Sequence, residues 1–432
     1  MRISPMKLIT SIFFGATFIA LLANLSSFIL FVLLARWLTL EEFGKFTLAF
    51  SWIMFLRMVT TLGYHRAILK LLPVYRTQYS PNSARALLSH AHSHTITAAC
   101  ATAFVITICI CIYYAEATVE YSWLLFMLAA LPVAAVTQVR AHALRAWGNT
   151  LLSLTAITLN INVTLILSLY LIFIVFGEVS LFEAGLMFLV SNFVNLGLIS
   201  YYYPSFRIDK RLRDQIRTRK KNWQQLSLLL MLAAAAGQFL PLIVILVSGP
   251  LLSTEQLGLL VASHRIALFI NLPLFVVGTI VAPLFAGLYA KSDQRSLRRL
   301  FVGSQITVVA CVGLSASIVV YYAELILTFF GPEFAAATKI LIVLVLFQFA
   351  QASFGPIGEL LAMTNFERHL LTTNIFFVMA TTFGALVSTY IYAIWGAIIT
   401  TSLLLVLHKI TLYVTGWKKT FSDFPAQTSL RK

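Results

Sequence analysis

Charged residues are scarce in this sequence: Asp, Glu, Lys and Arg together make up only 11% of its 432 residues, whereas 60% of the residues are hydrophobic. The mean hydropathy is +0.90. Apolar runs of about 20 residues, the length that crosses a bilayer as a helix, recur along the whole chain. The scarcity of charge excludes a water-soluble protein, and the apolar runs predict a polytopic, all-α membrane protein.

Cysteines and recognisable catalytic motifs are also scarce. The four cysteines, Cys100, Cys109, Cys111 and Cys311, fall in apolar runs, so we expect small core residues rather than disulfides or metal ligands. The sequence has no Walker, HExxH or GxSxG motif, so we expect no enzyme. The histidines of SHAHSH at 89–94 lead into a predicted helix, where residues two apart diverge, so we expect no metal site and no cofactor.

Twelve transmembrane helices are predicted from the apolar runs. Their approximate ranges are 8–35, 45–66, 93–115, 121–145, 150–176, 180–203, 226–248, 257–288, 300–322, 338–363, 368–392 and 394–415. The first has a basic start, as a signal peptide does. Because its apolar stretch is too long for a signal peptide and more spans follow, we interpret it as an uncleaved transmembrane helix.

Charge alternates between the predicted loops. Lys and Arg concentrate in one set of loops and in the C-terminal tail, and Glu concentrates in the other set; Arg36, Lys45 and Lys339 are exceptions. By the positive-inside rule, this alternation predicts an even number of spans with both termini in the cytoplasm. The same rule accounts for the net charge of +16, so we expect no nucleic acid partner.

A long basic segment, RIDKRLRDQIRTRKK at 207–221, divides the chain near its middle. It either contacts anionic lipid headgroups or binds a partner. We predict four regions: an N-terminal six-helix bundle at 1–204, a basic cytoplasmic linker at 205–225, a C-terminal six-helix bundle at 226–417 and a cytoplasmic tail at 418–432.

The two halves share a repeated segment. LTLEEFG at 38–44 recurs as LSTEQLG at 252–258, an offset of 214 residues, and each copy precedes the second predicted helix of its half. At the same offset Arg57 is matched by Asn271. Because both helices start on the same side, the halves are predicted to be related by a pseudo-two-fold axis along the membrane normal.

Polar residues within the predicted helices identify a candidate cavity. Arg57 lies on the order of 20 Å inside its apolar run, where a charge costs roughly 2.5–3.5 kcal/mol on insertion scales and usually faces a bundle interior. Arg265, Asn271 and Asn24 would line the same cavity, whose basic surface suits a phosphate or pyrophosphate group. Alternatively, Arg57 is a structural residue bonded to backbone carbonyls, and Arg265 snorkels to the outer interface.

Further ionisable residues lie near the predicted inner ends of helices. Arg66, Arg140 and Arg145 either follow the positive-inside rule or form a cytoplasmic access site for a phosphorylated substrate. Pro356, between two glycines, is predicted to break or kink its helix. Glu359, just beyond it, could couple transport to protons, pair with a base across the cavity, or simply lie at the inner interface.

Five segments carry a resemblance to a known family. They are ARWLTLEEFGKFTLAF at 35–50, LGYHRAILKLLPVY at 62–75, ASHRIALFINLPLFVVGTIVAPLFAGLYAKSD at 262–293, the tenth-helix region at 329–369 and YAIWGAIITTSLL at 392–404. They resemble the bacterial polysaccharide-unit (O-antigen type) flippases of the multidrug/oligosaccharidyl-lipid/polysaccharide exporter superfamily. The resemblance spans essentially the whole chain.

The resemblance implies two six-helix bundles around a central cavity with alternating access. In related flippases, cationic residues on the second and eighth helices line the cavity, and Arg57 and Arg265 occupy such positions. The flippase of the peptidoglycan lipid precursor also resembles this chain, but it has a charged pair on its first helix and helices beyond twelve. Here only Asn24 lies near that pair, which argues against a close relation to that branch.

The resemblance to the polysaccharide branch implies a function. We expect a flippase of the bacterial cytoplasmic (inner) membrane that moves an undecaprenyl-pyrophosphate-linked oligosaccharide from the inner to the outer leaflet, for O-antigen and lipopolysaccharide synthesis. Its expected partners are the polyprenyl-pyrophosphate-linked glycan, membrane lipids, and the polysaccharide polymerase and chain-length machinery.

The alternative within the superfamily is a multidrug or other cation-coupled antiporter. An antiporter of cationic drugs would prefer acidic cavity residues, and Glu359 is the one acid predicted within the membrane. A polymerase or ligase would need a large outside loop with catalytic bases, but the predicted outside loops are short. A structural scaffold would not explain the predicted intramembrane position of Arg57.

Overall fold

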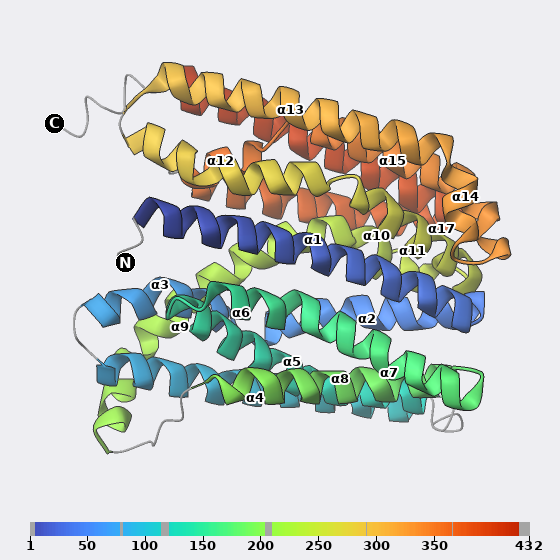
Figure 1. The fold of residues 1–432 in the computed structure, drawn as a ribbon, viewed down its shortest axis with the longest axis horizontal. Helices are drawn as coiled ribbons and strands as arrows, with labels where there is room; N and C mark the ends of the chain where they lie inside the picture. Colours follow the sequence, from blue (N-terminus) through green and yellow to red (C-terminus); the bar gives the residue numbers. More distant parts are fainter. Residues whose placement is uncertain are drawn as a thin grey trace. The chain divides into compact units, whose positions relative to one another are not determined.

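The computed structural model describes residues 5–77, 81–113, 121–203, 210–290, 292–364 and 366–422. Within these ranges every regular element is a helix (Figure 1). The chain divides into two compact units, Met1–Ala235 (unit 1) and Ala236–Lys432 (unit 2). The predicted all-α class is confirmed.

Unit 1 is built around α5, which packs against α2, α3, α4 and α8. Its elements are α1 (Pro5–Trp37), α2 (Leu40–Thr60), α3 (Tyr64–Thr77), α4 (Pro81–Tyr113), α5 (Ser122–Ala146), α6 (Thr150–Leu154), the π-helical turn η1 (Thr155–Leu159), α7 (Asn160–Phe176), α8 (Leu181–Tyr201) and the first part of α9 (Lys210–Phe239). Small residues such as Ala134, Ala135 and Ala143 are buried along α5, so neighbouring helices can approach it closely.

Unit 2 has α15 in the corresponding role, packed against α11, α13 and α17. Beyond α9 its elements are η2 (Leu240–Leu242), α10 (Ile243–Leu246), η3 (Gly249–Leu251), α11 (Thr254–Phe269), α12 (Leu272–Ala290), α13 (Gln294–Tyr321), α14 (Ala323–Thr328), η4 (Pro332–Ala337), α15 (Thr338–Ala352), α16 (Ile357–Met363), α17 (Glu367–Trp417) and η5 (Lys418–Ser422).

The described helices account for the predicted membrane spans. Up to nine segments are long and apolar enough to cross a membrane, when each of two bent helix pairs is counted as one span. One of the nine, Arg368–Trp417, contains two spans, because Tyr392 and Ala393 leave the helical conformation in the middle of α17. The first two predicted spans correspond to α1 and α2, which are helical but are not among these nine. The prediction of about twelve transmembrane helices is therefore confirmed.

The second predicted helix, 45–66, ends earlier than expected, because α2 stops at Thr60. The next residues form a turn in which Leu62 and Gly63 have φ angles of 49° and 74°. A Cβ atom at Gly63 would lie 2.0 Å from the carbonyl oxygen of Ser227 in α9. Glycine therefore permits both the left-handed backbone and the close approach of α9.

Four other predicted helices are also interrupted. The range 150–176 contains the π-helical turn η1, and 226–248 contains the 3₁₀ turn η2. The range 257–288 bends by 43° between α11 and α12. The range 338–363 breaks between α15 and α16 at Pro356, as predicted.

The repeat predicted from the sequence is visible in two helix caps. Thr39 and Ser253, which are 214 residues apart, are the N-caps of α2 and α11. The Thr39 Oγ1 accepts a hydrogen bond from the Glu42 backbone nitrogen at 3.3 Å, and the Ser253 Oγ accepts one from the Gln256 backbone nitrogen at 3.2 Å. The same side-chain chemistry thus starts the equivalent helix in each unit.

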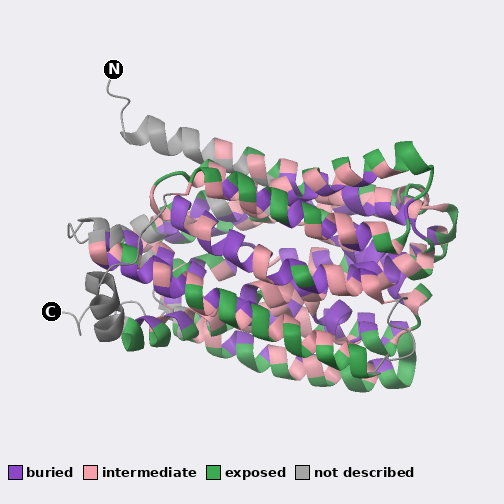
Figure 2. Ribbon diagram, turned by 90° about the horizontal axis from the view of Figure 1, so that it is seen from below, coloured by how far each residue is buried: buried purple, intermediate pink, exposed green. Residues whose placement is uncertain are grey.

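The surface of the helices is apolar, as lipid contact requires. Figure 2 shows exposed residues along the outer faces of the helices, and Ile112, Phe176 and Phe383 are 75%, 73% and 72% exposed. All four cysteines are exposed as well, so the prediction that they are core residues is wrong. The reason is that a lipid-facing helix surface has the same apolar composition as a protein core.

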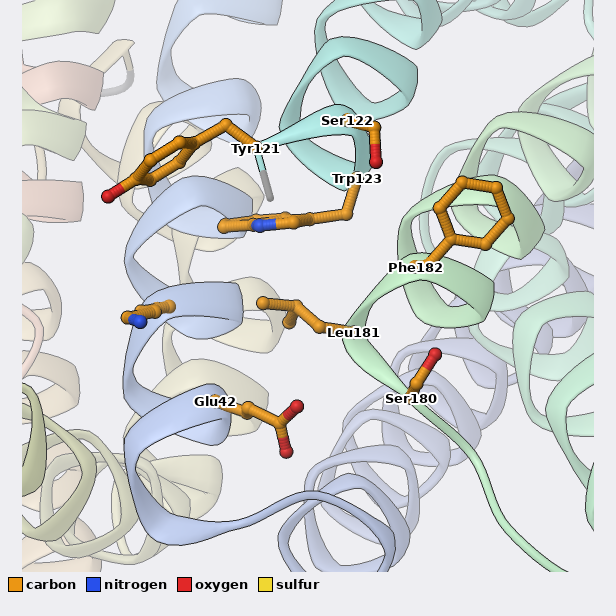
Figure 3. A pocket seen from close by; sticks show the side chains of 8 residues that line it. Glu42, Tyr121, Ser122, Trp123, Ser180, Leu181 and Phe182 are labelled. Atoms are coloured by element: carbon orange, nitrogen blue, oxygen red, sulfur yellow. The ribbon is translucent and has the colours of Figure 1, made fainter. Parts of the chain in front are cut away.

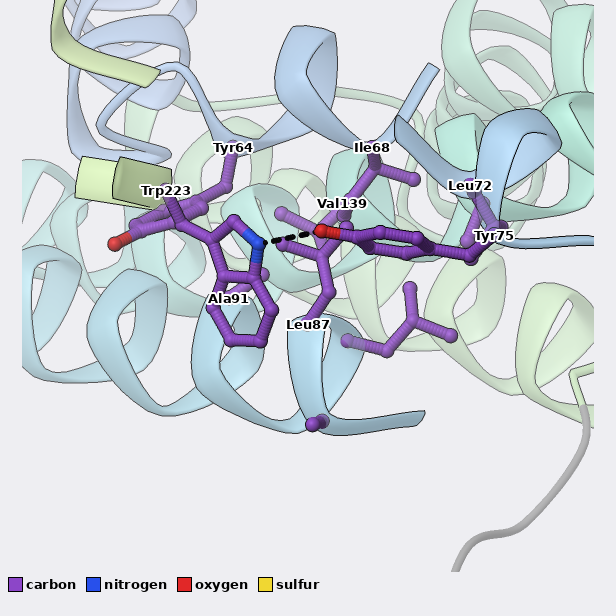
Figure 4. Close-up of a cluster of buried hydrophobic side chains, with 11 residues drawn as sticks. Tyr64, Ile68, Leu72, Tyr75, Leu87, Ala91, Val139 and Trp223 are labelled. Atoms are coloured by element: carbon purple, nitrogen blue, oxygen red, sulfur yellow. Dashed lines mark hydrogen bonds between the residues drawn. The ribbon is translucent and has the colours of Figure 1, made fainter. Parts of the chain in front are cut away.

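The segment between the predicted halves is helical from Lys210 onward, because α9 begins at that residue. Trp223 is only 2% exposed and packs in a cluster with Tyr64, Leu87 and other apolar residues of unit 1 (Figure 4). Its Nε1 donates a hydrogen bond to the Tyr75 hydroxyl oxygen at 2.9 Å. The end of the predicted linker, 205–225, therefore packs against α3 and α4 rather than forming a free loop.

Candidate functional site

Arg57 lines a narrow pocket inside unit 1, which we call the Arg57 pocket. In this conformation the elements α2, α5, η1 and α8 pack so closely around it that there is no room for a water molecule. The lining residues are Arg57, Ala134, Thr137, Gln138, Ala156, Ile157, Asn192 and Asn195. This lining combines one cation with three amides and a hydroxyl, and it contains no carboxylate, so it is suited to an anionic or polar ligand.

Two polar atoms of this pocket have no hydrogen-bond partner among the described residues. They are the Arg57 Nε and the Gln138 Oε1, and both are buried. Leaving a buried polar group unsatisfied costs about 1–3 kcal/mol, so such groups are rare. Because the first is a donor and the second an acceptor, a ligand with an anionic oxygen and a hydroxyl group would satisfy both once the surrounding helices separate enough to admit it.

The asparagines of α8 fix one wall of the Arg57 pocket. Asn192 and Asn195 are three residues apart and therefore share a face of α8. The Asn195 Nδ2 donates a hydrogen bond to the Ala156 carbonyl oxygen at 2.7 Å, within η1. The Asn160 Nδ2 donates to the Asn195 Oδ1 at 3.4 Å. Through these two bonds Asn195 stabilises the π-helical turn beside the pocket. Such turns are frequent at functional sites.

Basic side chains continue from the pocket toward the C-terminal end of α5. We call Arg57, His65, Arg66, His142 and Arg145 the basic cluster. The rings of His65 and His142 have centroids 5.0 Å apart. Both histidines interact electrostatically with Arg57 and Arg66, and Arg66 interacts with Arg145. Because Arg66 and Arg145 repel each other, an anion between them would be stabilised.

The two histidines of the basic cluster are fixed by hydrogen bonds. The Nδ1 of His142 lies 2.8 Å from the Gln138 carbonyl oxygen, which can only accept, so this nitrogen carries a proton. The Nδ1 of His65 lies 2.6 Å from the Thr61 Oγ1. Both side chains are therefore held on their own helices, with the rings turned toward each other.

The predicted cytoplasmic access residues separate into two groups. Arg66 and Arg145 are exposed members of the basic cluster. Arg140 is held elsewhere: its Nη1 donates a hydrogen bond to the Ser200 Oγ, and its guanidinium carbon lies 5.3 Å from the centroid of the Tyr203 ring. The structure thus connects Arg66 and Arg145 to Arg57 through His65 and His142, and it gives Arg140 contacts with α8 and the residues that follow it.

The other predicted cavity residues do not line the Arg57 pocket. Asn24 is exposed on α1 in unit 1. In unit 2, Arg265 is partly buried on α11, and Asn271 lies in the bend between α11 and α12. The Asn271 Nδ2 donates a hydrogen bond to the Gln348 Oε1 at 2.8 Å. This bond joins the bend to α15, as polar side chains do when they hold membrane helices together.

Glu359 lies in the first turn of α16 and is exposed. Its side chain lies beside α12, where a Cβ added to Gly278 would be 3.3 Å from the carboxyl carbon. It also interacts electrostatically with Lys409 of α17. One of the three roles predicted for Glu359 is pairing with a base, and Lys409 is a candidate for that base within unit 2.

Sequence reasoning did not identify several residues that the fold brings to these sites. Asn192 and Asn195 were missed, although the segment SNFVN places two amides three residues apart in an apolar helix. Lys409 was missed because the helix that holds it ends near basic residues. Among the described residues, no group of three or more His, Cys, Asp or Glu side chains could hold a metal ion.

Similarity to solved structures defines the class of this fold. A multidrug resistance MATE family transporter of the MOP superfamily, in an inward-facing conformation, matches with a TM-score of 0.67 and 15% identity, over 92% of this chain and 94% of the other. A MOP superfamily transporter from Pyrococcus furiosus, described by a reverse polarity of its binding pocket that suggests a different function, matches with a TM-score of 0.63 and 15% identity, over 98% and 97%.

The outward-facing conformation of a MATE family transporter also matches, with a TM-score of 0.60 and 16% identity, over 97% of this chain and 96% of the other. The fold is therefore that of the MOP superfamily transporters, which have twelve transmembrane helices in two bundles. No curated protein matches the sequence. The chain belongs to the polysaccharide biosynthesis protein family, whose sequence pattern matches residues 13–289.

Proposed function

We propose that this protein is a flippase that moves a polyprenyl-pyrophosphate-linked oligosaccharide across the bacterial cytoplasmic membrane. The family and the transporter fold support a role in polysaccharide transport. The observation that carries the proposal is the Arg57 pocket together with the basic cluster. A partly buried arginine whose Nε has no hydrogen-bond partner among the described residues, in one cluster with Arg66 and Arg145, matches a diphosphate better than it matches a cationic drug.

The proposed mechanism follows from the cost of moving polar groups through hydrocarbon. A diphosphate and its sugars cannot cross the bilayer core unaided. In the proposal, Arg66 and Arg145 attract the diphosphate, and Arg57 binds it deeper within unit 1. The prenyl chain stays in the lipid while the bundles alternate access to the two sides. A few arginines bind the headgroup reversibly, whereas a tighter cage would retain it.

The test is a translocation assay in proteoliposomes. A fluorescent prenyl-pyrophosphate oligosaccharide is incorporated in both leaflets, and its exposure to a membrane-impermeant reagent is followed with time. We expect the wild-type protein to speed the exposure of the inner pool, compared with protein-free vesicles. No acceleration under imposed proton and sodium gradients would reject the flippase assignment.

A cation-coupled antiporter is the second candidate, because the matching MATE structures have the same fold. Glu359 would then carry the coupling proton. If the protein is an antiporter, the Glu359→Gln variant should no longer make the host cell resistant to drugs. Under our proposal the same substitution leaves drug sensitivity of the host cell unchanged, and Glu255→Gln, which alters another exposed carboxylate of unit 2, serves as the control.

A further inference from the structure

A second pocket lies at the opposite end of unit 1 from the basic cluster, and we call it the Trp123 pocket. It has a volume of about 320 Å³, at the lower end of the range for small-molecule sites. The lining residues are Glu42, Lys45, Tyr121, Ser122, Trp123, Ser180, Leu181 and Phe182. Figure 3 shows the Trp123 ring on one side of Leu181 and the Glu42 carboxylate on the other.

The Trp123 pocket and the Arg57 pocket are built by the same three helices. The Trp123 pocket is formed at the N-terminal ends of α2, α5 and α8, whereas the Arg57 pocket lies further along each of them. From Glu42 to Arg57, from Trp123 to Gln138 and from Ser180 to Asn195 the chain advances by fifteen residues. At about 1.5 Å of rise per residue, the two pockets are about 22 Å apart along the helices.

The walls of the Trp123 pocket are held in place by local contacts. A Cβ atom at Gly185 would lie 2.5 Å from the Trp123 carbonyl oxygen, so this glycine lets α8 pack directly on the start of α5. The rings of Phe126 and Phe182 pack edge to face with centroids 5.3 Å apart. The Glu42 Oε2 accepts hydrogen bonds from the Thr39 backbone nitrogen and Oγ1 at 3.0 and 2.9 Å. The pocket is thus preorganised.

The lining of the Trp123 pocket is suited to a sugar ring. Beside the buried Trp123 ring, Tyr121 and Phe182 offer aromatic surface, on which the C–H faces of a sugar can stack. The Ser122 hydroxyl and the second carboxylate oxygen of Glu42 can hydrogen-bond the sugar hydroxyls. The Lys45 ammonium forms an ion pair with Glu41 at 2.8 Å, and the Ser180 hydroxyl donates to Glu183, so carboxylates outnumber cations at this pocket and an anionic ligand is disfavoured.

We infer that the Trp123 pocket is a saccharide subsite that binds a sugar residue of the translocated glycan. The inference rests on the proposed function, because it takes the glycan as the substrate. In this inference α2, α5 and α8 carry both sites: the diphosphate binds at the Arg57 pocket, and the sugar binds at the Trp123 pocket near the N-terminal ends of the same helices. The spacing of about 22 Å between the pockets corresponds to several sugar residues, so a glycan whose diphosphate lies at Arg57 could reach the Trp123 pocket.

The test measures sugar binding to the full chain without transport. The protein is reconstituted in lipid nanodiscs, because maltoside and glucoside detergents would themselves compete for a sugar site. Methyl glycosides of glucose, galactose and N-acetylglucosamine are titrated, and binding is detected by saturation-transfer NMR. We expect at least one glycoside to bind saturably. The variants Glu42→Gln and Phe182→Ala should weaken that binding by about threefold to tenfold, the range for losing one hydrogen bond or contact.

Matched variants serve as controls. Glu255→Gln and Phe383→Ala change an exposed carboxylate and an exposed ring of unit 2 that do not line the pocket, so they should leave sugar binding unchanged. Gln at position 42 can still form the capping box, so Glu42→Gln preserves the start of α2. Absence of saturable binding for all three glycosides, or equal binding by the pocket variants and the wild type, would overturn the inference.

A parallel titration separates this inference from the proposed function. Geranyl pyrophosphate, which carries no sugar, is titrated against the wild type and Arg57→Ala. Binding of geranyl pyrophosphate without binding of any glycoside would reject the saccharide subsite and support the flippase proposal. Saturable glycoside binding without pyrophosphate binding or translocation would reject the flippase proposal and support the pocket as a sugar site.

Discussion

Arg57 shows how one residue acquires its role from its neighbours. In the sequence it is a cation inside an apolar run, and two interpretations remain open. In the part of the chain that the structure describes, its Nε has no hydrogen-bond partner, and it lines a pocket with Gln138, Asn192 and Asn195. A purely structural arginine would be expected to use its donors on backbone carbonyls. The unpaired donor therefore supports the binding role.

The first prediction concerns this side chain. Arg57→Ala should reduce translocation of the labelled glycan lipid at least tenfold, because a charged hydrogen bond contributes about 1.5–3 kcal/mol. Arg57→Lys should retain part of the activity, since lysine keeps the charge but loses the planar array of donors. Leaflet exposure in proteoliposomes is the measurement. Arg299→Ala, at an exposed position of α13, is the control, and wild-type rates for Arg57→Ala would contradict the assigned role.

A second residue-scale prediction concerns Asn195. Asn195→Ala removes the donor that satisfies the Ala156 carbonyl oxygen in η1, so the variant should lose about 1–2 kcal/mol of folding free energy. It should also lower translocation, because η1 forms a wall of the Arg57 pocket. Thermal unfolding and leaflet exposure are measured on the same preparation. Ser168→Ala removes only a hydrogen bond to the backbone of its own helix, and should have little effect on either quantity.

At the scale of elements, the turn between α2 and α3 decides where the basic residues lie. Because α2 ends at Thr60, Arg66 belongs to a separate helix that packs on α4 and α5. The close approach of α9 at Gly63 and the bond from Trp223 to Tyr75 hold this arrangement. The segment that leads into unit 2 is therefore packed against the helix that carries part of the basic cluster.

The prediction at this scale compares two glycines with positive φ. Gly63→Ala should lower stability by at least about 2 kcal/mol, since it adds backbone strain of about 1–3 kcal/mol and a clash with Ser227. Gly177 has a φ of +80° but no atom within 4 Å of an added Cβ, so Gly177→Ala should suffer the strain alone. The melting temperatures of both variants, measured in the same detergent, provide the comparison. An equal loss in both would show that the contact with α9 does not matter.

At the scale of the whole molecule, the charge pattern predicts an orientation in the membrane. Lys and Arg gather on one set of loops and Glu on the other, which predicts that both termini lie in the cytoplasm. The fold agrees with an even number of spans. The orientation itself stays a prediction from the sequence.

Single cysteines in a variant without the four native cysteines test this orientation. Glu255→Cys, at the exposed start of α11, should react with an impermeant maleimide added to intact cells. Arg295→Cys, at the exposed start of α13, should react only after the cells are permeabilised. Both positions belong to unit 2, so they provide internal controls for each other. The reverse labelling pattern would invert the predicted topology.

The sequence by itself determined the class of the protein. Apolar runs separated by turns require helices that satisfy their backbone hydrogen bonds internally, so the all-α membrane fold and the number of spans follow from composition. The caps at Thr39 and Ser253 and the break at Pro356 also follow, because they depend on residues that are adjacent in the chain. Arg57 stands out for a similar local reason, since its cost in hydrocarbon is a property of one residue.

Only the tertiary structure decided which polar residues share a site. Arg57, Gln138 and Asn195 come from three helices separated by many residues, and the spacing within each helix does not show which faces meet. The same reason explains why the lipid-facing cysteines were assigned to the core, and why the turn at Gly63 was not predicted. An apolar face looks alike toward lipid and toward protein, and a glycine shows its purpose only when the helix that approaches it is in place.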